Sequence, residues 1–143
     1  MATKPQKTIG LSDLCFGCGK NNPHGLKLKV EWDGATATAE FIPTKFHQGF
    51  SDVIHGGVIT TLLDEAMGHA AYNRGIKCFT ATMQTRFKRP LSIGEPVIIT
   101  ASVTRKARKL VETEAKMTLK DGTPIAECTA VQIVPISESD KEE

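Results

Sequence analysis

The sequence contains no long hydrophobic run, no marked excess of charge and no internal repeat. No apolar stretch approaches the roughly 20 residues that a membrane-spanning helix requires, so we predict no membrane as partner. Residues 1–10 carry Lys4 and Lys7 without the apolar core of a signal peptide, and we therefore expect a cytoplasmic protein. The formal net charge of +2 gives no electrostatic reason to expect a nucleic acid as partner.

The chain also lacks the second pair of closely spaced ligands that a structural zinc site usually needs. Cys15 and Cys18 form a Cys-x-x-Cys pair in a glycine-containing segment that is typical of a loop. His24 and His47 would complete a zinc site only if the fold brought them to this pair. We therefore expect reduced thiols, no metal and no cofactor, and keep zinc at the Cys-x-x-Cys pair as the alternative. The remaining cysteines lie in apolar strand patterns and are expected in the core: Cys78 and Cys128.

Length and composition predict one folded domain. A chain of 143 residues is long enough for a single core, and 40% hydrophobic with 24% charged residues is ordinary for a globular protein. We place the domain at residues 11–136, between an N-terminal tail at 1–10 and an acidic C-terminal tail at 137–143.

Hydrophobic periodicity predicts one long helix and about six strands. Apolar residues recur at helical spacing between residues 56 and 73, where a helix is expected. Alternating patterns bounded by turn signals predict strands at 26–32, 35–42, 76–89, 97–107, 110–119 and 125–134. One apolar helical stripe needs one sheet face to cover it. We therefore predict an α+β fold in the order β-β-α-β-β-β-β, with an antiparallel sheet wrapped around one central helix.

The start of the predicted helix suggests acyl-transfer chemistry. His55-Gly56-Gly57 places accessible backbone N–H groups at the positive end of the helix dipole, where a carbonyl oxygen can gain charge. Asp64, two turns further on, can activate water or attack directly. Gly57 and Asp64 are about 10 Å apart along the axis, so one carbonyl cannot contact both groups of the same helix. If the two groups act together, two antiparallel copies of the helix are needed, which predicts a dimer with two equivalent sites. A glycine turn followed by a solvated aspartate is the alternative.

Four segments of the chain resemble one family. They are a cysteine-containing entry segment, the loop ending in His55-Gly56-Gly57, the helix with Asp64, and a strand ending in Arg89-Pro90, at residues 15–28, 47–57, 58–68 and 80–90. Together they resemble the hotdog-fold acyl-CoA thioesterases, specifically the phenylacetic-acid-degradation type.

This resemblance implies two central roles. Asp64 is the general base or nucleophile toward the thioester, and the backbone N–H of Gly57 from a partner subunit polarises the thioester carbonyl. Glu65 follows Asp64 directly but lies about 100° further around the helix, so both cannot face one spot. A related hotdog group uses a helical glutamate, which keeps Glu65 as the alternative carboxylate.

The resemblance also implies supporting roles for three side chains. His55 fixes the loop or contacts the carbonyl or water, and a helix cap is its structural alternative. A hydroxyl on the strand after the helix holds the water; Thr80 is the better match and Thr82 is close enough to be confused with it. Gln48 is the candidate for an amide that contacts the carbonyl, with an ordinary surface glutamine as the alternative.

An acyl-CoA substrate carries phosphates, and basic side chains near the strand at 80–90 are suited to bind them. A charged strand edge that resists aggregation explains the same residues without a ligand. We assign substrate contacts to Gly56, Thr61, Thr82, Arg86, Lys88 and Arg89. The family often assembles as a homotetramer of two homodimers, which we expect here.

Two other functions stay open. The first is a non-catalytic acyl-CoA-binding or sensor protein, although no helix-turn-helix accompanies the domain. The second is a zinc-stabilised interaction module built on Cys15 and Cys18. The acyl group of the substrate is not predictable, because it depends on how side chains pack across the expected interface.

Overall fold

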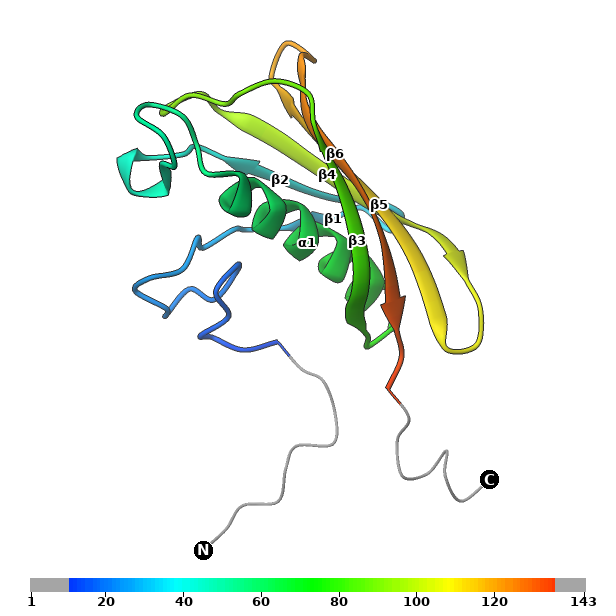
Figure 1. Cartoon of the computed structure of the whole chain (residues 1–143). Helices are drawn as coiled ribbons and strands as arrows, with labels where there is room; N and C mark the ends of the chain where they lie inside the picture. Colours follow the sequence, from blue (N-terminus) through cyan, green and yellow to red (C-terminus); the bar gives the residue numbers. More distant parts are fainter. Residues whose placement is uncertain (1–10, 136–143) are drawn as a thin grey trace, which may run out of the picture.

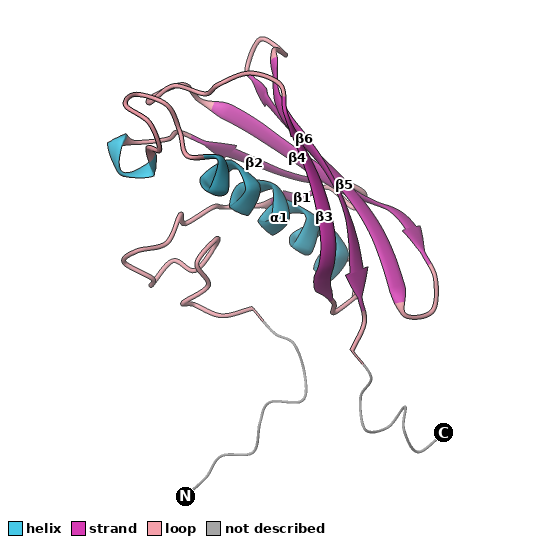
Figure 2. Ribbon diagram, viewed as in Figure 1, coloured by secondary structure: helices cyan, strands magenta, loops and turns pink. Residues whose placement is uncertain are grey.

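Helix α1 (Gly56–Asn73) lies against one face of a six-stranded antiparallel sheet in the computed structural model, which describes residues 11–135 (Figure 1; Figure 2). The strands are β1 (Glu31–Trp32), β2 (Ala37–Phe41), β3 (Phe79–Phe87), β4 (Val97–Lys106), β5 (Leu110–Leu119) and β6 (Pro124–Ile133), with a short 3-10 helix η1 (Lys45–His47) after β2. The predicted fold class and element order are confirmed. The predicted tails at 1–10 and 137–143 lie outside the described residues.

The apolar stripe of α1 forms the centre of the core. Its buried residues recur at helical spacing and pack on the inner face of the sheet: Ile59, Leu62, Leu63, Ala66, Met67, Ala70 and Ala71. The helix ends where the sequence predicted, because Gly75 adopts a φ of 80° and its N–H donates to the Tyr72 carbonyl at 2.9 Å. Within the described residues, no helix combines the length and apolar character needed to cross a membrane.

The strand order across the sheet is β1-β2-β4-β5-β6-β3. β3 therefore lies at one end, where within residues 11–135 it pairs only with β6. The register of this pair shifts between Thr80 and Thr82, which marks a β-bulge near the start of β3. Most residues of β3 are exposed, although an edge strand of nine residues is long for a sheet margin.

The first predicted strand, at 26–32, is wrong over most of its length, since only Glu31–Trp32 pairs with β2. Leu26 and Leu28 are buried, so the alternating pattern does report which side chains face the core. Their N–H groups, however, donate to the carbonyl oxygens of residues 16 and 17, in the N-terminal segment before Leu26, at 2.8 Å each. Lys27 between them has a φ of 55°, which is incompatible with an extended strand.

Candidate active site

His55 fixes the first turn of α1. Its carbonyl accepts from the Val58 N–H at 2.9 Å, and its Nδ1 accepts from the Gly57 N–H at 2.8 Å. The imidazole thereby satisfies one of the amide donors that a helix start leaves without an intrahelical acceptor. The Gly57 amide that the sequence assigns to a substrate carbonyl is thus held by a side chain of the same chain.

Both glycines at this helix start are next to bulky neighbours. A Cβ on Gly57 would lie 3.0 Å from His55 Nδ1, so the cap fits closely only over glycine. A Cβ on Gly56 would lie 3.5 Å from Cζ of Phe87, which is ordinary contact. For the Gly56 N–H itself, residues 11–135 offer no hydrogen-bond acceptor. The exposed helix start therefore has one capped amide and one available amide.

Asp64 lies two turns further along α1 and is half-buried. The Oγ1 hydroxyl of Thr80, at the start of β3, donates to Asp64 Oδ1 at 2.7 Å. Of the two threonines that the sequence offered, the structure brings Thr80 to Asp64. Thr82 follows the β-bulge and lines a hollow of about 420 Å³ with residues of β4, β5 and β6. The hydrogen bond fixes the orientation of the Asp64 carboxylate and leaves Oδ2 for other contacts.

The two parts of this site come from one rigid helix, about 10 Å apart along its axis. A carbonyl held at the amides of one chain is therefore out of reach of the Asp64 carboxylate of that chain. The neighbouring edge of β3 has no partner strand within residues 11–135. Phe46, in η1, and Phe50, in the loop before α1, are 84% and 87% exposed.

The sequence model of the thioesterase superfamily matches residues 52–126, more than half of the chain, including the helix start, Asp64 and β3. The chain belongs to the thioesterase superfamily. The resemblance that the sequence motifs indicated is confirmed at this level.

Individual known proteins are also similar to this superfamily member. It is 28% identical over 87 residues to the acyl-coenzyme A thioesterase THEM4 of Mus musculus, covering 60% of this chain and 37% of the relative. The chain thus spans little more than a third of that relative's length. The PaaI protein of the E. coli phenylacetic acid degradation operon is similar with a TM-score of 0.72 and 18% identity, over 76% of this chain and 83% of PaaI. The protein smu.793 of Streptococcus mutans, solved bound to acetyl CoA, has a TM-score of 0.72 and 15% identity, over 77% of this chain and 90% of that one. These likenesses show the hotdog fold.

Gln48 uses its side-chain amide within its own loop. Its Nε2 donates to the Lys45 carbonyl at 2.8 Å, and its Oε1 accepts from the Asp52 N–H at 2.7 Å. Asp52 has a φ of 65°, so the loop turns sharply just before the superfamily motif. In the single chain, Gln48 therefore stabilises the loop, and its amide is not available to a substrate without breaking these bonds.

Two of the three predicted basic contacts have acidic partners. Lys88 Nζ lies 3.3 Å from Glu127, and Arg89 Nη2 lies 3.3 Å from Glu95. The Ser92 N–H and Arg89 hold the pKa of the Glu95 carboxyl below its usual value. Such partly exposed ion pairs stabilise the fold by about 0–1 kcal/mol each, so a phosphate can compete with the acidic partners for these basic groups.

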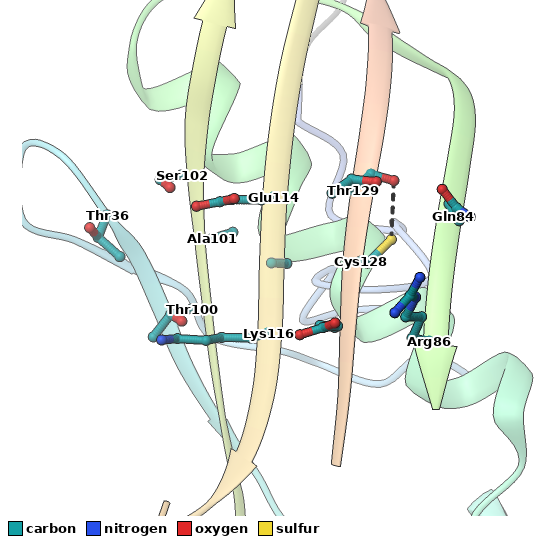
Figure 3. A pocket seen from close by; sticks show the side chains of 12 residues that line it. Thr36, Gln84, Arg86, Thr100, Ala101, Ser102, Glu114, Lys116, Cys128 and Thr129 are labelled. Atoms are coloured by element: carbon teal, nitrogen blue, oxygen red, sulfur yellow. Dashed lines mark hydrogen bonds between the residues drawn. The ribbon is translucent and has the colours of Figure 1, made fainter. Parts of the chain in front are cut away.

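Arg86 lies on the outer face of the sheet, away from α1. With Gln84 of the same strand it lines a hollow of about 770 Å³ that also includes Thr129 of β6 (Figure 3). This hollow is larger than the one that Thr82 lines, yet Gly57, Asp64 and Thr80 do not line it. We therefore do not take it as the catalytic site, and the structure does not bring Arg86 to Asp64.

The remaining predicted contact is Thr61, whose Oγ1 donates back to the Gly57 carbonyl at 2.8 Å. Sequence reasoning missed Phe87, whose ring is the group that a Cβ on Gly56 would contact. Phe87 shares one face of β3 with Thr85 and Met83, two and four residues before it, and this period of two could have placed it on the face turned toward α1.

The histidines considered for a metal site do not join the Cys-x-x-Cys pair. Within the described residues, the group able to hold a metal is instead Cys15, Cys18 and Glu65. His47 is engaged in η1, where its Nδ1 accepts from the Thr44 N–H at 2.9 Å.

Proposed function

We propose that this superfamily member hydrolyses acyl-CoA thioesters, with Asp64 as the reacting carboxylate and Gly57 of a second subunit as the donor to the carbonyl. The observation that carries the proposal is the hydrogen bond from Thr80 to Asp64, which orients a carboxylate on an accessible helix face. The mouse relative, named an acyl-coenzyme A thioesterase, and the neighbour solved with acetyl CoA support this substrate class.

The proposed reaction needs few groups. Asp64 accepts a proton from water as the water oxygen attacks the thioester carbon, or its carboxylate attacks first and water cleaves the resulting anhydride. The carbonyl oxygen gains negative charge at a helix-start N–H, the C–S bond breaks, and the CoA sulfur takes up a proton. Either route converts one thioester and one water into a carboxylic acid and free CoA.

A homodimer supplies the missing geometry. The long, exposed edge of β3 offers backbone groups to a second copy, and pairing two such edges would continue the sheet. An antiparallel arrangement around a two-fold axis then brings Gly57 of one chain toward Asp64 of the other. Two such dimers form the expected homotetramer.

Substrate binding at the Gly57 N–H exchanges one acceptor for another. His55 Nδ1 occupies this amide in the chain, so the thioester carbonyl either displaces the imidazole or binds the Gly56 N–H. A neutral hydrogen bond has a net worth of about 1 kcal/mol, which a substrate with many other contacts can offset. The same capped amide favours the second candidate function, an acyl-CoA-binding protein without turnover.

Thiol release from short, medium, long and aryl acyl-CoAs separates these two functions. We expect turnover by the wild type, a loss of at least a hundredfold in Asp64→Asn, and no loss in the control Glu114→Gln on the outer face of β5. Tight binding of intact acyl-CoA without thiol release would establish the binding function. Undiminished turnover by folded Asp64→Asn would remove Asp64 from its proposed role.

A mixing experiment tests the shared site. Gly57→Pro removes the amide N–H but also crowds the His55 cap, so its folding is checked by circular dichroism, and Asp64→Asn removes the carboxylate. Each variant alone is expected to be inactive, whereas refolding an equal mixture restores about a quarter of wild-type activity through heterodimers with one intact site. No recovery in a mixture shown to contain heterodimers would contradict a site built from two chains.

A further inference from the structure

Two thiols and a carboxylate meet on the side of α1 reached by the N-terminal segment. Cys15 Sγ lies 3.4 Å from Glu65 Oε1, and the ligand atoms of Cys15, Cys18 and Glu65 all lie within 4.8 Å of one another. His69, one turn after Glu65, places its Nε2 3.3 Å from the same carboxylate oxygen. This Nε2 is buried, and within the described residues its contact with Glu65 does not meet the geometry of a hydrogen bond.

The backbone around the cysteines is wound tightly. The Cys18 N–H points to Cys15 Sγ at 3.5 Å, and the Gly19 N–H donates to the Cys15 carbonyl at 2.9 Å. A Cβ on Gly19 would overlap the backbone of Cys15, and a Cβ on Gly17 would overlap the Glu65 carboxylate. Glycines at these two positions therefore allow the loop to close around one sulfur and press against Glu65.

Two measured distances, both from Glu65 Oε1, fit the edges of a tetrahedral zinc site. Zinc binds cysteine sulfur at about 2.3 Å and histidine nitrogen or carboxylate oxygen at about 2.0–2.1 Å, which sets ligand-to-ligand edges of about 3.3–3.8 Å. The edges measured from Glu65 Oε1, to sulfur at 3.4 Å and to His69 Nε2 at 3.3 Å, lie within this range. Zinc binding displaces the protons of the two thiols, and the divalent cation then offsets most of the negative charge of two thiolates and a carboxylate.

We propose that Cys15, Cys18 and Glu65 bind one zinc ion, and that the His69 imidazole, which lies outside this three-residue group but 3.3 Å from Glu65 Oε1, moves in as the fourth ligand. The site is structural, because all four positions are protein ligands and no position stays open for water. It fastens the N-terminal segment to α1, and its cysteines lie outside residues 52–126, which the superfamily model matches. The site is separate from the proposed catalytic group, since Glu65 and Asp64 point about 100° apart around the helix.

Metal content of the full-length protein tests the proposal directly. After expression with zinc and dialysis against metal-free buffer, mass spectrometry of the metal is expected to give about one zinc per chain. Cys15→Ser and His69→Gln are expected to lower this content at least fivefold. Cys78→Ser is the matched control, because that half-buried thiol lies near Gln132, and it should retain the metal. Unchanged zinc in Cys15→Ser, or less than a tenth of an equivalent in the wild type, would overturn the proposal.

Spectroscopy of the wild type guards against variants that do not fold. X-ray absorption at the zinc edge is expected to show two sulfur scatterers at about 2.3 Å and two nitrogen or oxygen scatterers at about 2.0–2.1 Å. Cobalt in place of zinc should give a thiolate-to-metal charge-transfer band and the intense visible bands of a tetrahedral site. A shell of nitrogen and oxygen alone, or no thiolate band, would show that the thiols and Glu65 form only hydrogen bonds.

Discussion

Replacing Thr80 by valine tests whether the Thr80 hydroxyl orients the Asp64 carboxylate. Valine keeps the shape and the strand preference of threonine but removes the hydroxyl that donates to Asp64 Oδ1 at 2.7 Å. Hydrogen bonds to charged groups are worth about 1.5–3 kcal/mol, and the exposure of Thr80 favours the lower end. Since 1.36 kcal/mol corresponds to a tenfold change in rate, we expect kcat to fall by about 10- to 30-fold.

The assay is steady-state thiol release from the best acyl-CoA substrate. Thr80 acts through Asp64 and not on the CoA moiety, so KM should stay within about twofold of the wild type. Thr80→Ser, which keeps a hydroxyl, is expected to recover most of kcat. Thr82→Val, beyond the β-bulge, should leave kcat unchanged because Thr82 is not the partner of Asp64. Wild-type kcat in Thr80→Val, or an equal loss in Thr82→Val, would refute the assignment.

Three further outcomes follow from the structure. Burial lowers the pKa of His47 from its ordinary 6.5, so the neutral ring stabilises the fold above that pH and the stabilisation is lost as the pH falls. The melting temperature of the wild type should therefore drop more between pH 7 and 5 than that of His47→Gln, which keeps a capping-box residue without a titrating ring. Equal drops in the two proteins would contradict this. Lys88→Ala should raise KM for acyl-CoA about three- to tenfold but leave KM unchanged for an acyl thioester without the nucleotide, and the control Lys116→Ala should change neither KM. An equal rise in KM for both substrates in Lys88→Ala would argue against phosphate contact. Leu62→Ala should lower the free energy of unfolding in urea by about 2–5 kcal/mol, because Leu62 is fully buried between α1 and the sheet, and a loss below about 1 kcal/mol would show a core that collapses easily.

The sequence predicts those features of the fold that depend on local spacing. The extent of α1 follows from its apolar stripe and from Gly75, where the required left-handed φ favours glycine. The resemblance to the family, with a count back from Pro90, indicates Thr80 as the hydroxyl near Asp64. The extent of the helix depends on one element and one turn, so tertiary contacts do not alter it.

Other features depend on contacts between distant segments and could not be predicted. The alternation of Leu26 and Leu28 gives their burial, but a period of two does not identify the hydrogen-bonding partner of the backbone. Likewise, Gln48 and His55 donate or accept within one loop whose path depends on the positive φ of Asp52. Glu65 and His69 are spaced as neighbours on one helix face, yet nothing in the sequence shows that the loop with Cys15 folds over them.

Two adjacent residues of α1, Asp64 and Glu65, contact different parts of the molecule. Asp64 faces β3, where Thr80 holds its carboxylate, and Glu65 faces the N-terminal segment. The helix turn that carries both is therefore fixed from two sides, by a hydrogen bond to the sheet and by the proposed metal site. Because the Thr80 bond does not pass through the cysteines, loss of the metal should loosen the N-terminal segment while the orientation of Asp64 is kept. Zinc removal is thus expected to lower the melting temperature and to leave kcat close to that of the zinc-bound protein. A large loss of kcat with an unchanged melting temperature would mean that the N-terminal segment itself positions the catalytic carboxylate.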